Sequence, residues 1–217
     1  MHGRPVRAGL ASATVDWVEV IGFVTGAACV WLAARQHVAN FPVGIANNLV
    51  FVVLFWQAGI GANAALQVVY LVLGALGWYW WVRGGPDRST LPVRRTPRAV
   101  WPVAAVVVVL GTVALARVLD ATGASVQPLW DGGTTALSLV AQLMLGRKWV
   151  GSWAVWIVTD VLLIGLYLSL GLYLTAALYV LLIALCVQGW RAWSRDLRTG
   201  SQEDDAAPAT AAPGVPA

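Results

Sequence analysis

Two tryptophans and a carboxylate share one face of an otherwise apolar segment. Trp153, Trp156 and Asp160 are spaced i, i+3 and i+7, which places them on the same side of a helix. A carboxylate in an apolar membrane helix costs roughly 3 kcal/mol to insert, so it usually faces a bundle interior or a wet cavity. Asp160 is therefore the first candidate binding residue. The alternatives are a structural Asp that a neighbouring helix satisfies, and a Trp153 that only marks the membrane interface.

Other polar side chains recur at helical spacing in neighbouring apolar segments. The longest stripe contains Asp131, Thr134, Thr135, Ser138 and Gln142. A single Ser or Thr in such a segment more often bonds its own backbone or joins two helices. Stripes in several segments at once instead predict a shared polar cavity. Its predicted lining comprises Asn48, Trp56, Gln57, Gln67, Tyr70, Thr135, Ser138, Gln142, Trp153, Trp156, Asp160 and Tyr179.

These groups suit one kind of ligand, an aromatic ring joined to a polar sugar. Aromatic faces and a carboxylate favour a positively charged ring by about 1 to 2 kcal/mol where water is excluded. His2 and His37 stand alone near segment ends, and no Cys/His pair has the spacing of metal ligands. The sequence contains neither a Gly-rich phosphate loop nor a nucleophile elbow, which argues against an ATP-driven pump and a membrane hydrolase. We therefore predict a binding site with no catalytic residue, metal or cofactor.

Composition places this site in a polytopic membrane protein. Of 217 residues, 59% are hydrophobic and 11% are charged, which leaves no soluble domain of useful size. Cys29 and Cys186 fall in apolar segments and are interpreted as small packing residues. Seven segments approach the length of about 20 residues that a helix needs to cross a bilayer, and their short joints make neighbours antiparallel. They cover residues 16–35, 41–59, 62–82, 99–119, 129–146, 150–170 and 173–193.

The two ends of the chain differ from these segments. Residues 1–14 are short and polar, and no separate apolar region of a cleaved signal peptide precedes the first segment. Residues 194–217 become acidic and then rich in Ala and Pro. Such a composition has too few large apolar side chains to pack, so we predict a disordered tail.

Basic residues are distributed unevenly between the two sides of the predicted membrane. Of the 14 Lys and Arg residues, only Arg4, Arg7 and Arg117 fall on one side, and eleven fall on the other. Because cytoplasmic loops carry the excess of basic residues, we predict that the N-terminus lies outside and the C-terminus in the cytoplasm. A role in setting this topology explains the basic loop of residues 83–98 better than nucleic-acid binding does. The predicted macromolecular environment is a lipid bilayer, with no nucleic acid.

An internal repeat emerges when the chain is shifted against itself by 112 residues. The Gly-Trp-x-x-Trp run that starts at Gly77 then falls on one that starts at Gly189, and Asn48 falls on Asp160. One intervening segment restores the membrane orientation, so the two triplets are parallel repeats, which are typical of transporters. The predicted organisation is an outer N-terminal segment (1–14), a first three-helix repeat (15–82), a basic loop (83–98), a connecting helix with an outer loop (99–127), a second three-helix repeat (128–193) and a tail (194–217).

Several runs together resemble the PnuC family of bacterial vitamin transporters. The resemblance covers about residues 16–193, and Trp153-x-x-Trp156-x-x-x-Asp160 matches the motif that this family associates with substrate binding. Asn63 is a departure from the family, in which an acidic residue is common at this position. Further matching runs are residues 54–57 (Leu-Phe-Trp-Gln), 77–80 (Gly-Trp-Tyr-Trp), 130–138, 147–148 (Arg-Lys) and 171–179.

The resemblance implies a fold and a function. The fold is an all-α integral membrane protein of seven helices in a 3+1+3 arrangement, similar to the SWEET sugar transporters. The protein is expected to form a homotrimer in the bacterial cytoplasmic membrane. Its expected activity is facilitated diffusion of nicotinamide riboside, made one-way by phosphorylation of the vitamin in the cytoplasm.

Three alternatives stay open at this point. The first is another vitamin, thiamine or riboflavin, carried by members of the same family. The second is proton-coupled transport through Asp160, Glu19 and Asp131, although acids at segment ends more often only anchor a helix or attract cations. The third, from a different class, is a membrane sensor or scaffold that transports nothing.

Overall fold

The computed structural model of the protein describes residues 17–57, 59 and 61–206, with side chains described from Val24 to Thr199. Within that part of the chain the fold consists of seven α-helices, and each predicted segment coincides with one of them. All predicted ends but one agree within three residues. The predicted all-α class is therefore confirmed. The helices are α1 (Trp17–Ala34), α2 (Asn40–Gln57), α3 (Gly61–Arg83), α4 (Val100–Thr122), α5 (Pro128–Gly146), α6 (Ser152–Ser169) and α7 (Tyr173–Ala206).

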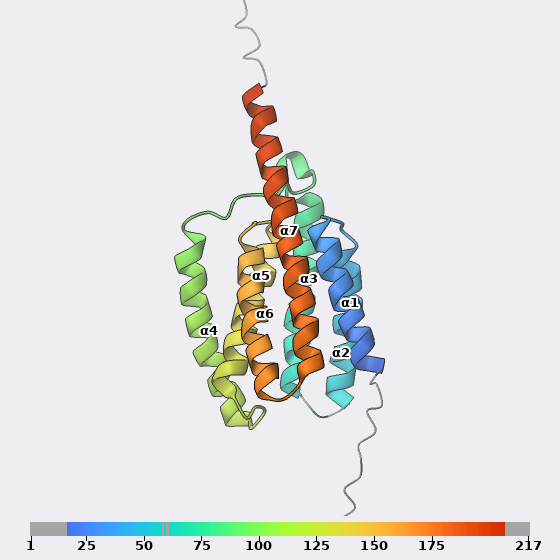
Figure 1. Cartoon of the computed structure of the whole chain (residues 1–217), viewed down its shortest axis with the longest axis vertical. Coiled ribbons are helices and arrows are strands. Elements are labelled where there is room, and N and C mark those ends of the chain that lie inside the picture. Colours follow the sequence, from blue (N-terminus) through green and yellow to red (C-terminus); the bar gives the residue numbers. More distant parts are fainter. Residues whose placement is uncertain (1–16, 58, 60, 207–217) are drawn as a thin grey trace, which may run out of the picture.

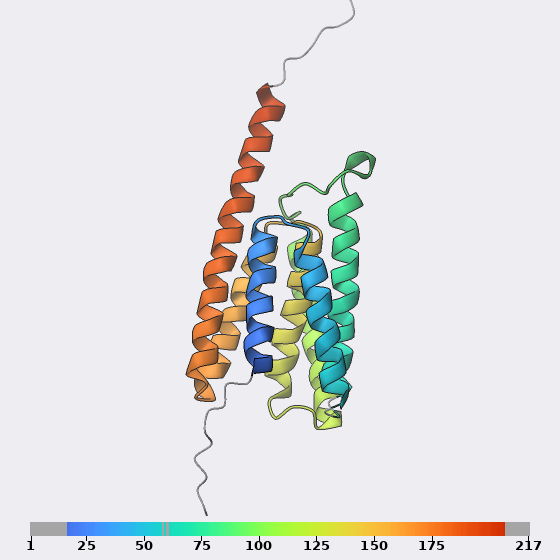
Figure 2. The ribbon, with the colours of Figure 1, turned by 90° about the vertical axis from the view of Figure 1, so that its right-hand side faces the viewer.

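Six of the helices form a closed ring. Extensive contacts join α1 to α2, α2 to α3, α3 to α5, α5 to α6, α6 to α7, and α7 back to α1. Helix α4 lies outside this ring against α5 (Figure 1). The connections α1–α2, α3–α4 and α5–α6 lie at one end of the bundle, which we call the loop end, and α7 projects beyond it (Figure 2). The ring encloses the space in which a site can form.

The helices differ in how well they suit a bilayer. In the described chain, five are long and apolar enough to cross a membrane: α2, α3, α4, α6 and the first 27 residues of α7. Helix α5 does not meet this criterion because its polar stripe lowers its hydropathy. In α1, the apolar stretch of described residues is the shorter run Val24–Ala34. A multi-pass membrane protein follows from these helices.

The end of α7 requires a correction to the predicted tail. The helix continues to Ala206, about 20 Å beyond the level of Trp193, whereas the sequence was expected to become disordered from residue 194. The prediction weighed apolar content alone. The residues after Trp193 extend a helix that is already formed, so each added residue gains a backbone hydrogen bond without the cost of a new nucleus. Residues 207–217 lie outside the described residues.

The basic loop between α3 and α4 is tied to the connection between α5 and α6. Arg94 N–H donates to the Lys148 carbonyl at 2.9 Å, and Val150 N–H donates to the Arg94 carbonyl at 3.1 Å. The side chain of Leu91 is buried in the core. These bonds join the two halves of the chain at the loop end.

Close packing at the loop end depends on a glycine in α7. A methyl group on Gly189 would lie 2.5 Å from Cζ2 of the Trp153 ring, well inside van der Waals contact. The corresponding position in α3, Gly77, would place its methyl group 2.6 Å from the Phe41 ring. Each glycine therefore lets a ring of a neighbouring helix lie directly against its own backbone.

We expect Gly189→Ala to lower the free energy of unfolding by about 1 to 3 kcal/mol, because the added methyl group overpacks a rigid indole. Thermal unfolding of the purified protein in detergent measures this change. Gly165→Ala in α6 is the matched control, since no heavy atom lies within 4 Å of its new methyl group. The control should be neutral or slightly stabilising, because Ala favours a helix more than Gly does. Equal melting temperatures for the two variants would contradict the packing argument.

Candidate functional site

A cavity of about 370 Å³ lies inside the helix ring. All six ring helices contribute to its lining, and none of the described residues of α4 does. Of the twelve residues predicted for the site, eight line this cavity: Asn48, Tyr70, Ser138, Gln142, Trp153, Trp156, Asp160 and Tyr179. The structure thus brings together residues from both halves of the chain. Their role in binding stays a prediction.

Asp160 is the acid of the cavity. Its side chain is only 4% exposed, and the Cys186 thiol lies 3.8 Å from its Oδ2 atom. Among the described residues, no basic group lies within ion-pair distance of this carboxylate, and the lining contains no Lys, Arg or His. A thiol is a weak donor, so it compensates little of the cost of burying a charge. The arrangement leaves a carboxylate that a cationic ligand would stabilise.

The two tryptophans of the predicted motif both border the cavity. Trp153 is 1% exposed, and its indole N–H finds no acceptor in the described part of the chain. A buried donor without a partner costs roughly 1 to 3 kcal/mol, so a ligand acceptor at this position would be favoured. Trp156, one turn further along α6, is half-buried and adds an aromatic face.

Amides and hydroxyls form the remaining polar wall. Asn48 and Asn47 project from α2, and the Thr25 hydroxyl donates to Asn47 Oδ1 at 3.2 Å. The rings of Tyr179 and Tyr167 lie 5.2 Å apart, between α7 and α6. Such groups satisfy the hydroxyls of a sugar.

Four predicted residues lie outside the cavity. Trp56, at the end of α2, is 75% exposed, and Gln57 beside it is exposed as well. Gln67 and Thr135 are half-buried but do not line the cavity. Helical spacing placed Gln67 and Thr135 on polar stripes, but a stripe is wider than the cavity it borders. Trp56 and Gln57 were predicted because they form the polar and aromatic end of their segment. A binding role for these four has no geometric support here.

Two hydroxyls of α5 bond to the backbone of their own helix, which is the alternative predicted for a single Ser or Thr. Thr134 donates to the Trp130 carbonyl at 3.0 Å, and Ser138 donates to the Thr134 carbonyl at 2.8 Å. Their donors are therefore occupied within the helix, and Ser138 offers the cavity an acceptor. Asp131 accepts a hydrogen bond from the Ser125 hydroxyl at the far end of α5, outside the cavity lining.

Sequence reasoning missed two cysteines of the cavity. Cys29 and Cys186 were interpreted as packing residues, yet both line the cavity, and Cys186 contacts Asp160. The spacing held a signal, because Cys186 follows Tyr179 by seven residues and so shares its helix face. Among the described side chains, no three His, Cys, Asp or Glu groups lie close enough together to hold a metal ion.

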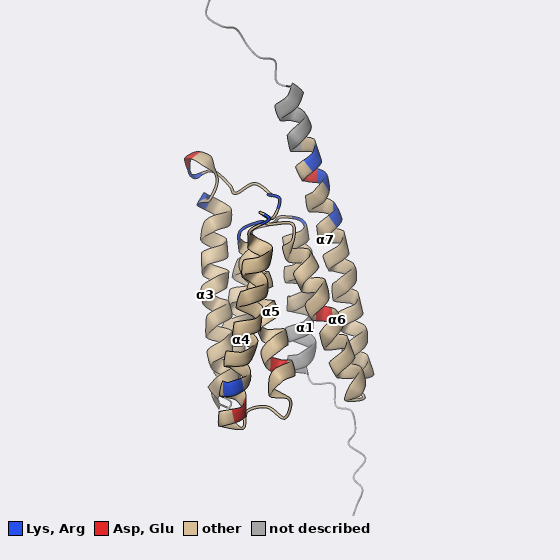
Figure 3. Ribbon diagram, turned by 90° about the vertical axis from the view of Figure 1, so that its left-hand side faces the viewer, with Lys and Arg blue, Asp and Glu red and all other residues tan. Residues whose placement is uncertain are grey.

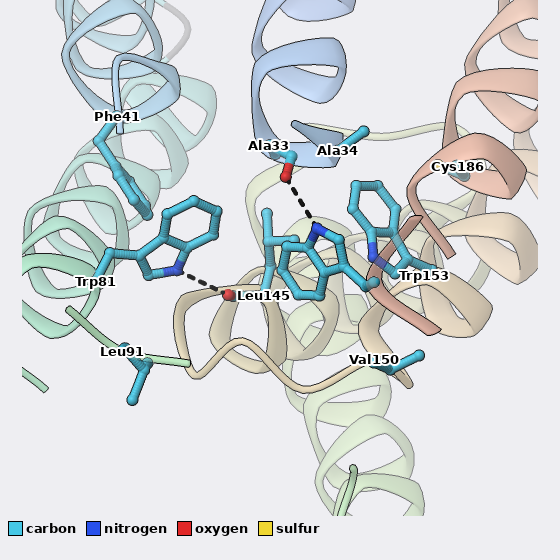
Figure 4. Packing of buried hydrophobic residues seen from close by; sticks show 10 residues of the cluster. Ala33, Ala34, Phe41, Trp81, Leu91, Leu145, Val150, Trp153 and Cys186 are labelled. Atoms are coloured by element: carbon cyan, nitrogen blue, oxygen red, sulfur yellow. Dashed lines mark hydrogen bonds between the residues drawn. The ribbon is translucent and has the colours of Figure 1, made fainter. Parts of the chain in front are cut away.

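Four aromatic rings pack together beside the cavity at the loop end, and we call them the tryptophan layer: Phe41, Trp81, Trp153 and Trp193. The Trp81 indole donates to the Leu145 carbonyl at 3.1 Å, and the Trp193 indole donates to the Ala33 carbonyl at 3.2 Å (Figure 4). Phe41 meets Trp81 edge-on at 5.0 Å, and Trp153 meets Trp193 in the same way at 5.3 Å. Trp81, Trp153 and Trp193 are almost fully buried.

A buried lysine lies just beyond the tryptophan layer. Lys148 is 6% exposed, its Nζ donates to Gln36 Oε1 at 3.2 Å, and it lies 4.5 Å from the centroid of Trp81. Gln36 in turn donates to the Asp196 carboxylate on α7. Burial lowers the pKa of Lys148 from 10.5 to about 8, while the charge of Asp196 acts in the opposite direction. This chain of contacts joins the α1–α2 connection, the α5–α6 connection and α7.

A ring of apolar helices around a cavity lined with polar and aromatic side chains is compatible with a membrane transporter. Residues 16–195 match the profile of the family described as Nicotinamide mononucleotide transporter, so the chain belongs to this family.

Relatives with assigned names agree with this membership. The chain is 26% identical over 219 residues to the "Nicotinamide riboside transporter PnuC" of Escherichia coli (strain K12), covering 89% of this chain and 91% of that protein. It is also 26% identical over 183 residues to the "Riboflavin/roseoflavin transporter RibM" of Streptomyces davaonensis, covering 82% and 85%. A structure titled "Crystal structure of the Vitamin B3 transporter PnuC" superposes with a TM-score of 0.67 at 21% identity, covering 85% of this chain and 83% of that one. This last likeness shows the fold.

We expect the contribution of Lys148 to the stability of the protein to rise with pH between about 8 and 10.5. In this window folded Lys148 is neutral, whereas in the unfolded chain it is still charged, so the unfolded state binds more protons. The gain is about 3 kcal/mol, or roughly 6 to 12 °C in melting temperature. Thermal unfolding in detergent at several pH values measures it.

Lys148→Met is the matched control, because it keeps an unbranched side chain of similar length and removes the charge. Lys148 is the only lysine of the sequence, so other groups that titrate in this window contribute equally to both proteins. The difference in melting temperature between wild type and Lys148→Met should therefore change in favour of the wild type as the pH rises. A constant difference would show that Lys148 keeps an ordinary pKa.

Proposed function

We propose that this chain transports nicotinamide riboside across the cytoplasmic membrane of a bacterium. Family membership and the printed name of the Escherichia coli relative support the substrate. The observation that carries the proposal is the buried Asp160, which has no cationic partner among the described residues and lies on a cavity lined with aromatic rings and amides. Nicotinamide riboside supplies the missing cation in its pyridinium ring, and its ribose hydroxyls match the amides.

The same observation argues against a phosphorylated substrate, although the family description names the mononucleotide. A phosphate group carries one to two negative charges and is normally bound by Arg, Lys or a helix N-terminus. The described lining residues include no cation, and Asp160 would repel the phosphate. The nucleoside therefore fits this cavity better than its phosphate ester does.

Riboflavin is the second candidate, because a relative is named as its transporter. Its three fused rings need more space than the single ring of nicotinamide, and about 370 Å³ is near the lower end of the range of ligand cavities. Its ring system is also uncharged, so it leaves Asp160 without a counter-charge. Thiamine remains a competitor on charge, because its thiazolium ring is also a cation.

The two helix triplets α1–α3 and α5–α7 are proposed to be parallel repeats of a SWEET-like fold, joined by α4. The supporting observation is that contacts in one half of the chain have counterparts in the other half, at residue numbers that differ by 112. The bond from Trp81 to the Leu145 carbonyl then becomes the bond from Trp193 to the Ala33 carbonyl. Phe41 and Trp153 are related by the same shift, as are Gly77 and Gly189. Two further related pairs, Gly59 with Gly171 and Gln36 with Lys148, share positive φ angles.

Several finer features complete the proposal. All seven helices cross the membrane, with the N-terminus outside and the C-terminus in the cytoplasm, because most basic residues lie at the loop end. The tryptophan layer then closes the cavity toward the cytoplasm, and release requires its two indole hydrogen bonds to break. Transport is facilitated diffusion through each protomer of a homotrimer, and phosphorylation in the cytoplasm retains the vitamin.

We expect proteoliposomes that contain the purified protein to take up labelled nicotinamide riboside until its concentrations inside and outside are equal. An imposed pH gradient should leave this endpoint unchanged when the membrane potential is clamped, because no proton is coupled. Excess unlabelled riboside should compete more strongly than nicotinamide mononucleotide, riboflavin or thiamine. Accumulation driven by the pH gradient would reject facilitated diffusion, and absence of uptake with retained binding would favour a sensor.

We expect Asp160→Asn to weaken binding of nicotinamide riboside by about 1 to 3 kcal/mol, roughly 5-fold to over 100-fold, because the counter-charge is lost. The uncharged reduced riboside should bind wild type and variant almost equally. Calorimetric titration of both ligands measures the difference.

Asp131→Asn is the control for this substitution, since it changes the same group at the end of α5, away from the cavity lining. It should leave both affinities unchanged. If Asp160→Asn weakens the charged and uncharged ligands equally, Asp160 only positions a hydrogen bond and the counter-charge role is wrong.

A further inference from the structure

Four arginines gather in a groove between α1 and α7 at the loop end. The groove has a volume of about 600 Å³ and lies outside the substrate cavity, with which it shares no lining residue. Its lining comprises Trp31, Ala34, Arg35, Gln188, Arg191, Ala192, Arg195 and Arg198. Basic residues are concentrated at this end and on the projecting part of α7 (Figure 3).

The arginines converge because of helical spacing. Arg191, Arg195 and Arg198 are spaced i, i+4 and i+7, so they share one face of α7. Arg35 faces them from the end of α1, where its guanidinium lies 4.9 Å from the centroid of the Trp31 ring. This stacking holds the fourth cation at the edge of the groove. All four side chains are exposed and remain free to bind a ligand.

No acid neutralises the groove among its described lining residues. The nearest carboxylate along α7, Asp196, accepts a hydrogen bond from Gln36 and lies on the side of Lys148. Membrane topology depends on how many basic residues lie on each side of the membrane. It does not require four of them to lie in one groove. Their mutual repulsion is relieved when an anion binds between them.

The depth of the groove fits the headgroup layer of a bilayer. The hydrogen bond from Trp193 to Ala33 places these two residues at the same level. Arg195 and Arg198 then lie roughly 3 to 8 Å further along the α7 axis. Each headgroup layer is about 5 to 8 Å thick, and a half-exposed tryptophan such as Trp31 is typical of its inner edge.

We propose that this groove binds the phosphate group of an anionic phospholipid, with Arg35 and Arg191 nearest the acyl chains and Arg195 and Arg198 around the headgroup. Guanidinium groups bind phosphate oxygens through paired hydrogen bonds, which gives geometric preference as well as charge. A soluble phosphate ester carries the same chemistry, but it lacks the acyl chains that would lie against Trp31 and the exposed apolar side of the bundle. This proposal does not rest on the identity of the transported substrate.

The test uses the full-length protein in phosphatidylcholine nanodiscs that contain either cardiolipin or no anionic lipid. Native mass spectrometry and thermal unfolding measure lipid retention and stabilisation. We expect the double variant Arg191→Gln/Arg195→Gln to bind cardiolipin about 30-fold more weakly than wild type, because each basic residue near an anionic surface contributes about fivefold. Arg191→Lys/Arg195→Lys should lose less, since it keeps the charge and loses only the paired hydrogen bonds.

Arg88→Gln/Arg95→Gln is the matched control, since it removes two exposed arginines from the α3–α4 loop at the same end of the bundle. It should retain cardiolipin like wild type. Equal losses in the two Gln variants would mean that only net charge attracts the lipid, and the groove would not be a site. Stabilisation of wild type by inorganic phosphate or nicotinamide mononucleotide in pure phosphatidylcholine, without any effect of cardiolipin, would overturn the lipid as the ligand.

Discussion

Two indole hydrogen bonds hold the bundle together at the level where its cavity ends. Trp81 of α3 donates to the last turn of α5, and Trp193 of α7 donates to the last turn of α1. Each bond crosses from one helix triplet to the other, so neither triplet completes this contact alone. The accepting carbonyls lie in the last turns of their helices and also accept backbone bonds, Ala33 from Gln36 N–H and Leu145 from Lys148 N–H, so the group that depends on each bond is the indole N–H. In a nonpolar interior such a bond is costly to leave unmade, so closing the layer and joining the triplets are the same event.

The tryptophan layer shapes part of the cavity wall. Trp153 lies edge-on against Trp193 and also lines the cavity, so a change in the tryptophan layer alters the wall that a ligand touches. Gly189 allows the contact because any side chain there would collide with the Trp153 ring. Asp160 lies seven residues further along α6, roughly 10 Å from the layer. A ligand that bridges this distance contacts both the acid and the closing rings, and in this way its presence can favour one state of the layer over another.

The sequence predicted the helices well because hydrophobic length and short connections leave few alternatives in a membrane protein. It also predicted eight of the lining residues, since polar side chains in apolar helices have few other places to lie. It failed for Trp56 and Gln57, because polar and aromatic residues at the end of a segment do not show how far along the helix axis the cavity extends. It also failed for Cys186, whose type gives no polar signal until Asp160 is placed beside it. The continuation of α7 to Ala206 was missed because apolar content predicts burial, whereas the extension of a helix that is already formed requires no burial.

On the proposed repeat, the two indoles whose hydrogen bonds join the triplets are identical in the two halves, whereas equivalent residues that line the cavity differ. Trp81 matches Trp193 and Gly77 matches Gly189, whereas Asn48 matches Asp160 and Phe41 matches Trp153. The layer joins two similar triplets, so the same residue type is suitable in each of them. A vitamin with a charged ring at one end and a sugar at the other has no such symmetry. A second acid in place of Asn48 would repel Asp160 in the low dielectric of the cavity and hold a cation more tightly than release permits. A single carboxylate opposite an amide gives the cavity one charged side and one neutral side, which is what an asymmetric cation requires.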